Sequence, residues 1–160
     1  MSDQFTVSVI PSSIVTSTAV LAGALRWEPM VQVVLEPARQ VDAAVVGVGS
    51  VDKNSRLVNL AYLTSKDAES LAEFGLVGVI LGPIFTVKGE VPDLPINERR
   101  IGLRLAELGQ VDRAVCVVGE RDKVDALRGA YRGGLLDVLI TGAGHRARRP
   151  DLESVARMVA

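Results

Sequence analysis

Cysteine and histidine are almost absent from the sequence, which contains one of each, Cys116 and His145. A single cysteine excludes a disulfide within the chain and is typical of a protein of the reducing cytoplasm. Because Cys116 lies inside an apolar run, we expect it to be a small buried side chain. His145 has no cysteine or carboxylate near it at the spacing of metal ligands, and no nucleophile motif accompanies it. We therefore predict neither a metal site nor hydrolase chemistry.

Long hydrophobic runs and a marked net charge are also missing. No apolar stretch approaches the roughly 20 residues of a membrane-spanning helix, and the first residues lack the basic start and apolar core of a signal peptide. The formal net charge of -1 gives the domain as a whole no electrostatic reason to bind nucleic acid or anionic lipid. We expect a cytoplasmic protein with no membrane contact and no direct contact with nucleic acid.

An apolar fraction of 48% in 160 residues is enough for one folded domain, residues 1–160. The clearest unit of this domain lies between residues 113 and 141. An apolar run at 114–118 is followed by a turn, an amphipathic helix bearing Lys123, the pair Gly133 and Gly134, and a second apolar run at 138–140. This succession predicts a complete βαβ unit.

Strand and helix patterns alternate along the rest of the chain. Residues 43–48 are continuously apolar, which is typical of a central parallel strand covered on both faces. Residues 76–87 are apolar but interrupted by glycine and proline, which favours two short strands with a kink. The whole pattern predicts an α/β fold with a mostly parallel sheet wrapped by helices. The other predicted elements are a strand at 5–10, helices at 17–27, 29–38, 66–74 (with Ser65 as N-cap) and 150–159, and short helical segments at 57–63 and 103–108.

Two loops have the composition of anion-binding sites. Gly47, Gly49 and Ser50 follow the predicted strand 43–48, where glycines let backbone N–H groups approach a phosphate and the serine offers a hydroxyl. The same residues also fit simple strand-to-loop geometry, because neither a dinucleotide fingerprint nor a phosphate-loop lysine is present. The ligand and the geometric interpretation both stay open at this loop.

The second loop leads into the helix of the βαβ unit. Gly119, Glu120 and Lys123 lie where a strand passes into a helix N-terminus, so free N–H groups and an ammonium group can converge on an anion. A lysine at this end opposes the helix dipole, so a functional role for Lys123 and a solvated helix face both stay open. Asp125 and Asp137 are possible general bases, but neither has a paired carboxylate, so no catalytic constellation is predicted.

Arginines cluster at positions 146, 148 and 149. They are able to bind phosphate or nucleic acid, but three arginines beside a loop more often form a solvated surface.

With these residues in view, the chain resembles the effector-binding domain of SorC/DeoR-type bacterial sugar-responsive transcriptional regulators. The resemblance implies a fold similar to ribose-phosphate isomerase and glucosamine-phosphate deaminase, a phosphorylated sugar as ligand, and oligomers whose DNA affinity changes with the sugar. It also implies that Lys123 is the family's ligand-contacting lysine and that Gly47, Gly49 and Ser50 form its strand-end loop. The matching motifs are VGVGS (46–50), FGLVG (74–78), GPIF (82–85), INERRIGL (96–103), VVGERDK (117–123) and YRGGLLDVLIT (131–141).

The sequence also departs from the family pattern. The family's helix-turn-helix and first phosphate loop would precede Met1. Val79 replaces an expected acidic residue, so an acceptor for sugar hydroxyls becomes apolar, and Pro83 replaces a common arginine. Thr86 and Gly142 stand at two further positions where acidic residues are expected. Each lost polar partner costs about 1 to 3 kcal/mol when the ligand group stays buried, so either the ligand differs or the site is vestigial.

Our first hypothesis is therefore an effector-binding or oligomerising domain of a regulator that binds a phosphorylated sugar and needs no cofactor. The fold also hosts phosphosugar isomerases and deaminases, so an enzyme is the first alternative. A purely structural fragment without a ligand is the second. A strand missing from the family fold would leave an open sheet edge, so we expect a homo-oligomer.

Overall fold

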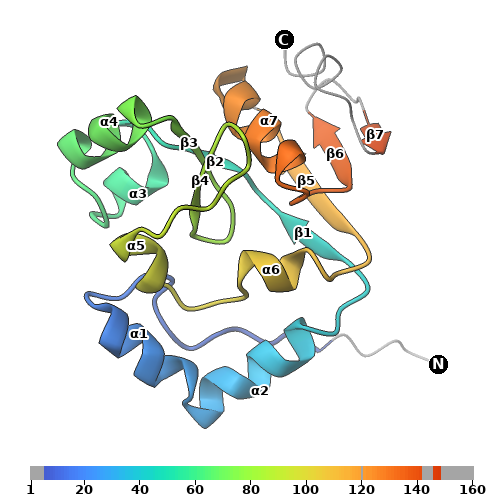
Figure 1. The fold of residues 1–160 in the computed structure, drawn as a ribbon. Coiled ribbons are helices and arrows are strands. Elements are labelled where there is room, and N and C mark those ends of the chain that lie inside the picture. The colour runs from blue at the N-terminus through green and yellow to red at the C-terminus, as the bar shows by residue number, and fades with distance from the viewer. Residues whose placement is uncertain (1–5, 120, 142–145, 149–160) are drawn as a thin grey trace.

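The computed structural model describes residues 6–119, 121–141 and 146–148. Two sheets and the helices around them form a mixed α/β arrangement (Figure 1). A four-stranded sheet has the order β1-β5-β6-β7, and a three-stranded sheet has the order β2-β3-β4. The strands are β1 (Ala44–Val46), β2 (Gly49–Ser50), β3 (Leu76–Val79), β4 (Ile84–Thr86), β5 (Ala114–Val118), β6 (Val138–Thr141) and β7 (Arg146–Arg148).

The four-stranded sheet contains the predicted βαβ unit. Strand β5 pairs in parallel with β1 on one side, with Val46 opposite Cys116, and with β6 on the other, with Cys116 opposite Leu139. Strand β7 runs antiparallel to β6. The parallel core of this sheet confirms the predicted fold class. The three-stranded sheet is antiparallel throughout, which the sequence patterns did not predict.

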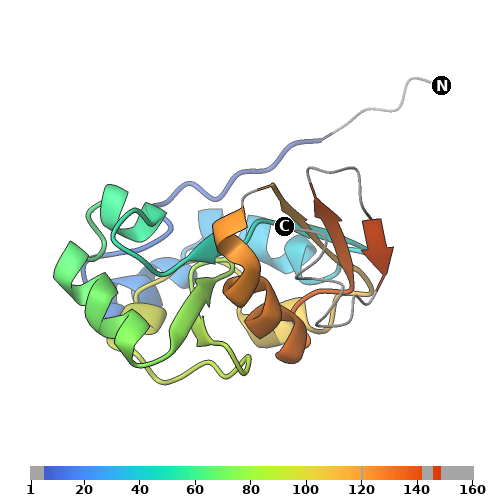
Figure 2. The same ribbon diagram turned by 90° about the horizontal axis from the view of Figure 1, so that it is seen from above.

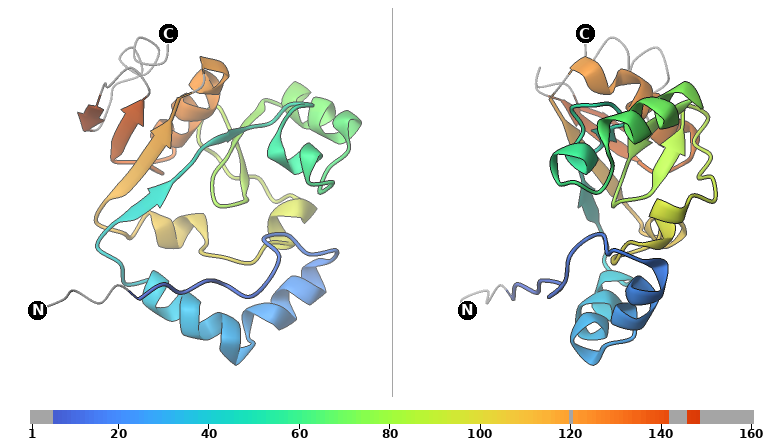
Figure 3. Two further views of the ribbon diagram at one scale, coloured as in Figure 1. Left: turned by 180° about the vertical axis from the view of Figure 1, so that it is seen from behind. Right: turned by 90° about the vertical axis from the view of Figure 1, so that its left-hand side faces the viewer.

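Helix α7 joins the two sheets. It connects β5 to β6 and packs on β3 and β4, so that it lies between the three-stranded sheet and strands β5 and β6 when seen from above (Figure 2). Helices α1 and α2 pack together at the opposite end of the molecule (Figure 3). The helices are α1 (Ala19–Arg26), α2 (Pro29–Ala38), α3 (Arg56–Asn59), α4 (Ser65–Glu73), α5 (Pro95–Glu98), α6 (Leu105–Leu108) and α7 (Val124–Arg132), with a 3-10 turn at Arg121–Lys123.

Two glycines allow α7 to approach the three-stranded sheet closely. A Cβ atom on Gly129 of α7 would lie 2.5 Å from the backbone oxygen of Thr86 and 3.0 Å from the Phe85 ring. A Cβ atom on Gly78 of β3 would lie 2.3 Å from the same ring, which is fully buried. Cβ atoms do not come this close to other atoms in unstrained proteins, so the absence of side chains sets the depth of this contact.

Local signals explain most helix boundaries. The Thr18 hydroxyl caps α1 by accepting a hydrogen bond from the Leu21 N–H (3.1 Å). Thr64 caps α4 and forms a capping box with Asp67, so the N-cap is one residue earlier than the predicted Ser65. Gly75 ends α4 with a φ of 77°, the left-handed conformation that favours glycine.

Two strand predictions were wrong. The described residues of segment 5–10 form no strand, and Val7 and Val9 are 84% and 75% exposed, because their alternating pattern finds no sheet to pair with. The predicted central strand at 43–48 is reduced to β1, which pairs only with β5 among the described strands and leaves Val45 74% exposed. The predicted helix at 150–159 lies outside the described residues. No helix in the described part of the chain is both long and apolar enough to cross a membrane.

Candidate functional site

Lys123 lies where the sequence predicts, at the passage from β5 into α7. It is the N-cap residue of α7 and makes no capping hydrogen bond there. Its ammonium group instead donates to the Ser50 hydroxyl at 2.9 Å and contacts the Asp122 carboxylate at 3.2 Å. The side chain is only 16% exposed. The structure therefore brings together Lys123 and Ser50, which come from the two loops predicted to bind an anion.

Asp52 belongs to the same cluster, and the sequence analysis missed it. The Ser50 hydroxyl donates to one Asp52 carboxylate oxygen, and the Asn54 N–H donates to the other at 2.6 Å. Ser50 is thus held between an ammonium group that donates to it and a carboxylate that accepts from it. The signal that could have revealed Asp52 is its position two residues after Ser50 in the polar loop at 50–56.

The strand-end loop opens into a cavity of about 690 Å³. Gly47, Gly49 and Ser50 line it, as the loop prediction requires, whereas Gly119 and Lys123 are not among the lining residues. Lys123 reaches the rim of the cavity through its bond to Ser50. Glu120, the remaining predicted site residue, lies outside the described residues. The volume is within the range of about 300–1,000 Å³ that holds small ligands.

Apolar side chains form most of this cavity's wall. They include Val79, which stands opposite Gly49 in the β2–β3 pair. Polar groups on the wall other than Ser50 come from Arg56 and Tyr62, which the sequence analysis did not single out. The Arg56 guanidinium makes no hydrogen bond or ion pair within the described residues. The cavity therefore offers one cation and a phenol beside the Ser50 hydroxyl, against an apolar background.

Other candidates from the sequence have structural partners. Asp137 accepts a hydrogen bond from the Ala114 N–H at 2.9 Å, and Asp125 pairs with Arg128 at 3.0 Å. Cys116 is fully buried in the main core, and this burial raises the pKa of its thiol to about 11, which confirms that it is a small buried side chain. Within the described ranges, no group of three or more histidine, cysteine or acidic side chains could hold a metal ion. His145 lies outside these ranges.

Comparison with known proteins gives the family. A family model described as "Putative sugar-binding domain" matches residues 2–147. The transcriptional regulator LsrR of Enterobacter sp. (strain 638) is 38% identical over 138 residues, which cover 84% of this chain and 43% of the regulator. LsrR of Klebsiella pneumoniae is 34% identical over the same coverage. The chain thus spans less than half the length of these curated relatives.

Solved structures agree with this relationship. A DeoR family transcriptional regulator from Listeria monocytogenes superposes with a TM-score of 0.78 at 27% identity, over 94% of this chain and 57% of that one. A domain of a possible sugar-binding transcriptional regulator from Arthrobacter aurescens gives 0.72 at 31% identity, over 91% and 52%. These relatives are bacterial transcriptional regulators, and the chain belongs to the "Putative sugar-binding domain" family.

Proposed function

We propose that this chain is the effector-binding domain of a sugar-responsive transcriptional regulator, and that its ligand is a phosphorylated sugar held at the strand-end cavity. The observation that carries the proposal is the bond between Lys123 and Ser50 at the rim of that cavity. It joins a cation and a hydroxyl from two loops 73 residues apart. Membership of the family supports the sugar as the ligand class.

Each group has a part in this proposal. The Lys123 ammonium, which uses two of its three donors on Ser50 and Asp122, has a third donor for a phosphate oxygen. Arg56 supplies the cation on the cavity wall, and Asp52, which does not line the cavity, fixes the Ser50 hydroxyl by accepting its hydrogen bond. The backbone of Gly47, Gly49 and Gly119 and the side chain of Glu120 complete the proposed ligand-binding residues.

The apolar wall of the cavity restricts which sugar phosphates can bind. Val79 faces the cavity where the family pattern has an acidic residue, so a sugar hydroxyl buried there would lose its acceptor. We therefore expect a ligand that presents an apolar or deoxygenated face to Val79 and its phosphate to Lys123. If valine at position 79 instead abolishes sugar binding, the alternative is a domain that no longer binds any sugar.

The proposal assigns no catalysis to the chain. The relatives are transcriptional regulators, and the two aspartates considered as general bases are engaged with Ala114 and Arg128. DNA contact by the whole regulator, the cytoplasm as its location and assembly into a homo-oligomer belong to the same proposal.

A thermal-shift panel of sugar phosphates tests the site. Stabilisation of the wild-type chain by one or more of them at millimolar concentration is expected. The Lys123→Ala variant should bind that ligand about 10- to 100-fold more weakly, because a hydrogen bond to a charged group contributes roughly 1.5–3 kcal/mol. Lys88→Ala, which removes an exposed lysine of the turn after β4, is the matched control and should bind as the wild type does.

Two results would count against the site. If no sugar phosphate stabilises the wild type, the sensing function fails and a structural role remains. If Lys123→Ala and Lys88→Ala respond equally, the ligand does not use Lys123. Turnover of a phosphosugar by the wild type would instead support the enzyme alternative.

A further inference from the structure

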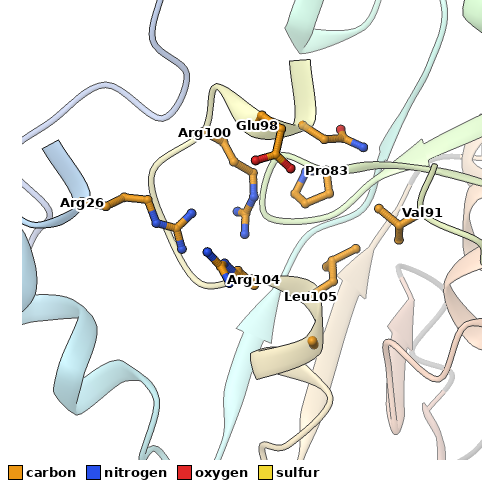
Figure 4. Close-up of a pocket in the computed structure, with 9 residues that line it drawn as sticks. Arg26, Pro83, Val91, Glu98, Arg100, Arg104 and Leu105 are labelled. Atoms are coloured by element: carbon orange, nitrogen blue, oxygen red, sulfur yellow. The ribbon is translucent and has the colours of Figure 1, made fainter. Parts of the chain in front are cut away.

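A second cavity, of about 580 Å³, lies between the end of α1 and the segment that joins α5 to α6. Three arginines line it, namely Arg26 from the last turn of α1, Arg100 after α5, and Arg104 immediately before α6. Their guanidinium groups converge on the same space (Figure 4). None of its lining residues lines the strand-end cavity, although the two cavities adjoin at residues 81–83 and 100–104.

Arg100 is the central residue of this cluster. Its side chain is buried, with 3% of the residue exposed. Nη1 donates to the Leu81 carbonyl, but Nη2 is buried and has no hydrogen-bond partner among the described residues. Burial, followed by repulsion from Arg26, lowers the pKa of Arg100 to about 10, so the guanidinium stays charged at neutral pH. A buried guanidinium nitrogen without an acceptor is a costly arrangement that an oxyanion would relieve.

The negative charges around the three arginines do not balance them. Glu107 is already engaged, because one of its oxygens accepts from Arg39 at 2.9 Å and the other from the Arg104 N–H at 2.6 Å. Glu98 lines the cavity but makes no ion pair within 4.0 Å among the described residues. The Arg26 guanidinium donates only to the Gly102 carbonyl, at 3.3 Å, within the part of the chain that the structure describes. The cavity therefore has more guanidinium groups than carboxylates available to them.

We propose that this cavity binds a small oxyanion through Arg26, Arg100 and Arg104. The oxyanion is inorganic phosphate, or the phosphate or carboxylate group of a free metabolite. Guanidinium groups match such anions because each presents two parallel N–H donors to two oxygens. This site is separate from the one proposed at Lys123, and neither depends on the other for its residues. Arg100 donates to the Leu81 carbonyl, and Leu81 lines the strand-end cavity. An anion bound to Arg100 is therefore one residue away from the strand-end cavity.

The test uses inorganic phosphate as the probe, with potassium chloride at equal ionic strength as the reference. It is performed on the whole chain carrying Lys123→Ala, so that phosphate at the strand-end site does not contribute. Phosphate at tenfold excess over its Kd should raise the melting temperature by about 3–6 °C in a chain of this size. Arg104→Gln, which alters an exposed side chain, should abolish most of this rise, and so should Arg26→Gln.

Arg128→Gln is the control, because it removes the same charge from α7, where Arg128 pairs only with Asp125 in the described part of the chain. It should keep the full response. Arg100→Met replaces the buried guanidinium with an apolar side chain, and the variant should melt no lower than its parent in phosphate-free buffer and ignore phosphate. An equal response in Arg104→Gln and Arg128→Gln, or no rise above potassium chloride, would overturn the proposal. So would a melting temperature that follows protein concentration but not phosphate, since the arginines would then belong to a contact between copies.

Discussion

Replacing Gly129 with alanine should destabilise the domain, although alanine is the better helix former. In an exposed helix interior, glycine to alanine stabilises by about 0.8–1.0 kcal/mol. At Gly129, however, the new Cβ would lie 2.5 Å from the Thr86 backbone oxygen, and a backbone atom has no rotamer with which to move away. Helix α7 must shift from the sheet, and overpacking of this kind costs about 1–3 kcal/mol. The overpacking cost should outweigh the helix gain, for a net loss of up to about 2 kcal/mol.

Gly23 provides the matched control. It lies within α1, and a Cβ atom placed on it meets no atom within 4 Å. Gly23→Ala should therefore stabilise the domain by about 0.8–1.0 kcal/mol. Urea denaturation of both variants measures the two free energies of unfolding, and the melting temperatures should move in opposite directions by about 2–4 °C per kcal/mol. If Gly129→Ala stabilises as much as Gly23→Ala does, α7 does not depend on a close contact with the three-stranded sheet.

Three further outcomes follow from single contacts. The Thr64 hydroxyl and N–H donate to Asp67 and hold the pKa of that carboxyl below its usual range. The stability that these bonds contribute is therefore complete above the unfolded pKa of about 4 and is lost as pH falls through the lower folded pKa. Thr64→Ala should make the melting temperature less sensitive to acid in that pH window. The Cys116 thiol, with its pKa raised to about 11, should resist a thiol reagent at pH 8 until urea unfolds the chain, and fast labelling of the native protein would contradict its burial. One edge of β1 has no partner among the described strands and should pair between copies, so light scattering should show a homo-oligomer that Val45→Lys shifts toward monomer. A sharp wild-type monomer peak at high concentration would refute this use of the edge.

The parts of the fold that the sequence predicts are those whose signals are local. The strands and helix of the βαβ unit around Lys123, and the glycines that end its helix, all lie between residues 113 and 141. The structure confirms each of them. Thr64 and Gly75 likewise delimit α4 through their own backbone and side-chain chemistry. Strand position is different, because it depends on partners that are distant in sequence. The apolar run at 43–48 was expected to be central for its composition alone, but only β5 pairs with β1 among the described strands.

The candidate site divides in the same way. Ser50 and Lys123 were each found from their own loops, but their contact spans 73 residues and only the fold brings them together. Asp52 was missed because an aspartate in a polar loop is ordinary until Ser50 is seen to donate to it. Arg26 and Arg100 stand 74 residues apart in the chain, and no short pattern relates them. Burial without a partner, which identifies Arg100, is a property of the folded protein alone.

The Lys123–Ser50 bond also determines how occupancy of the strand-end cavity would be transmitted. Lys123 follows β5 of the four-stranded sheet, and Ser50 belongs to β2 of the three-stranded sheet. The hydrogen bond from the Lys123 ammonium to Ser50 therefore links the two sheets. In the proposed complex, a phosphate that accepts from the third donor of this ammonium would join the same link, with its sugar on the β2 side. A ligand bound in this way would strengthen the link between the two sheets. Slower hydrogen exchange at the β2 amides on binding would be its direct signature.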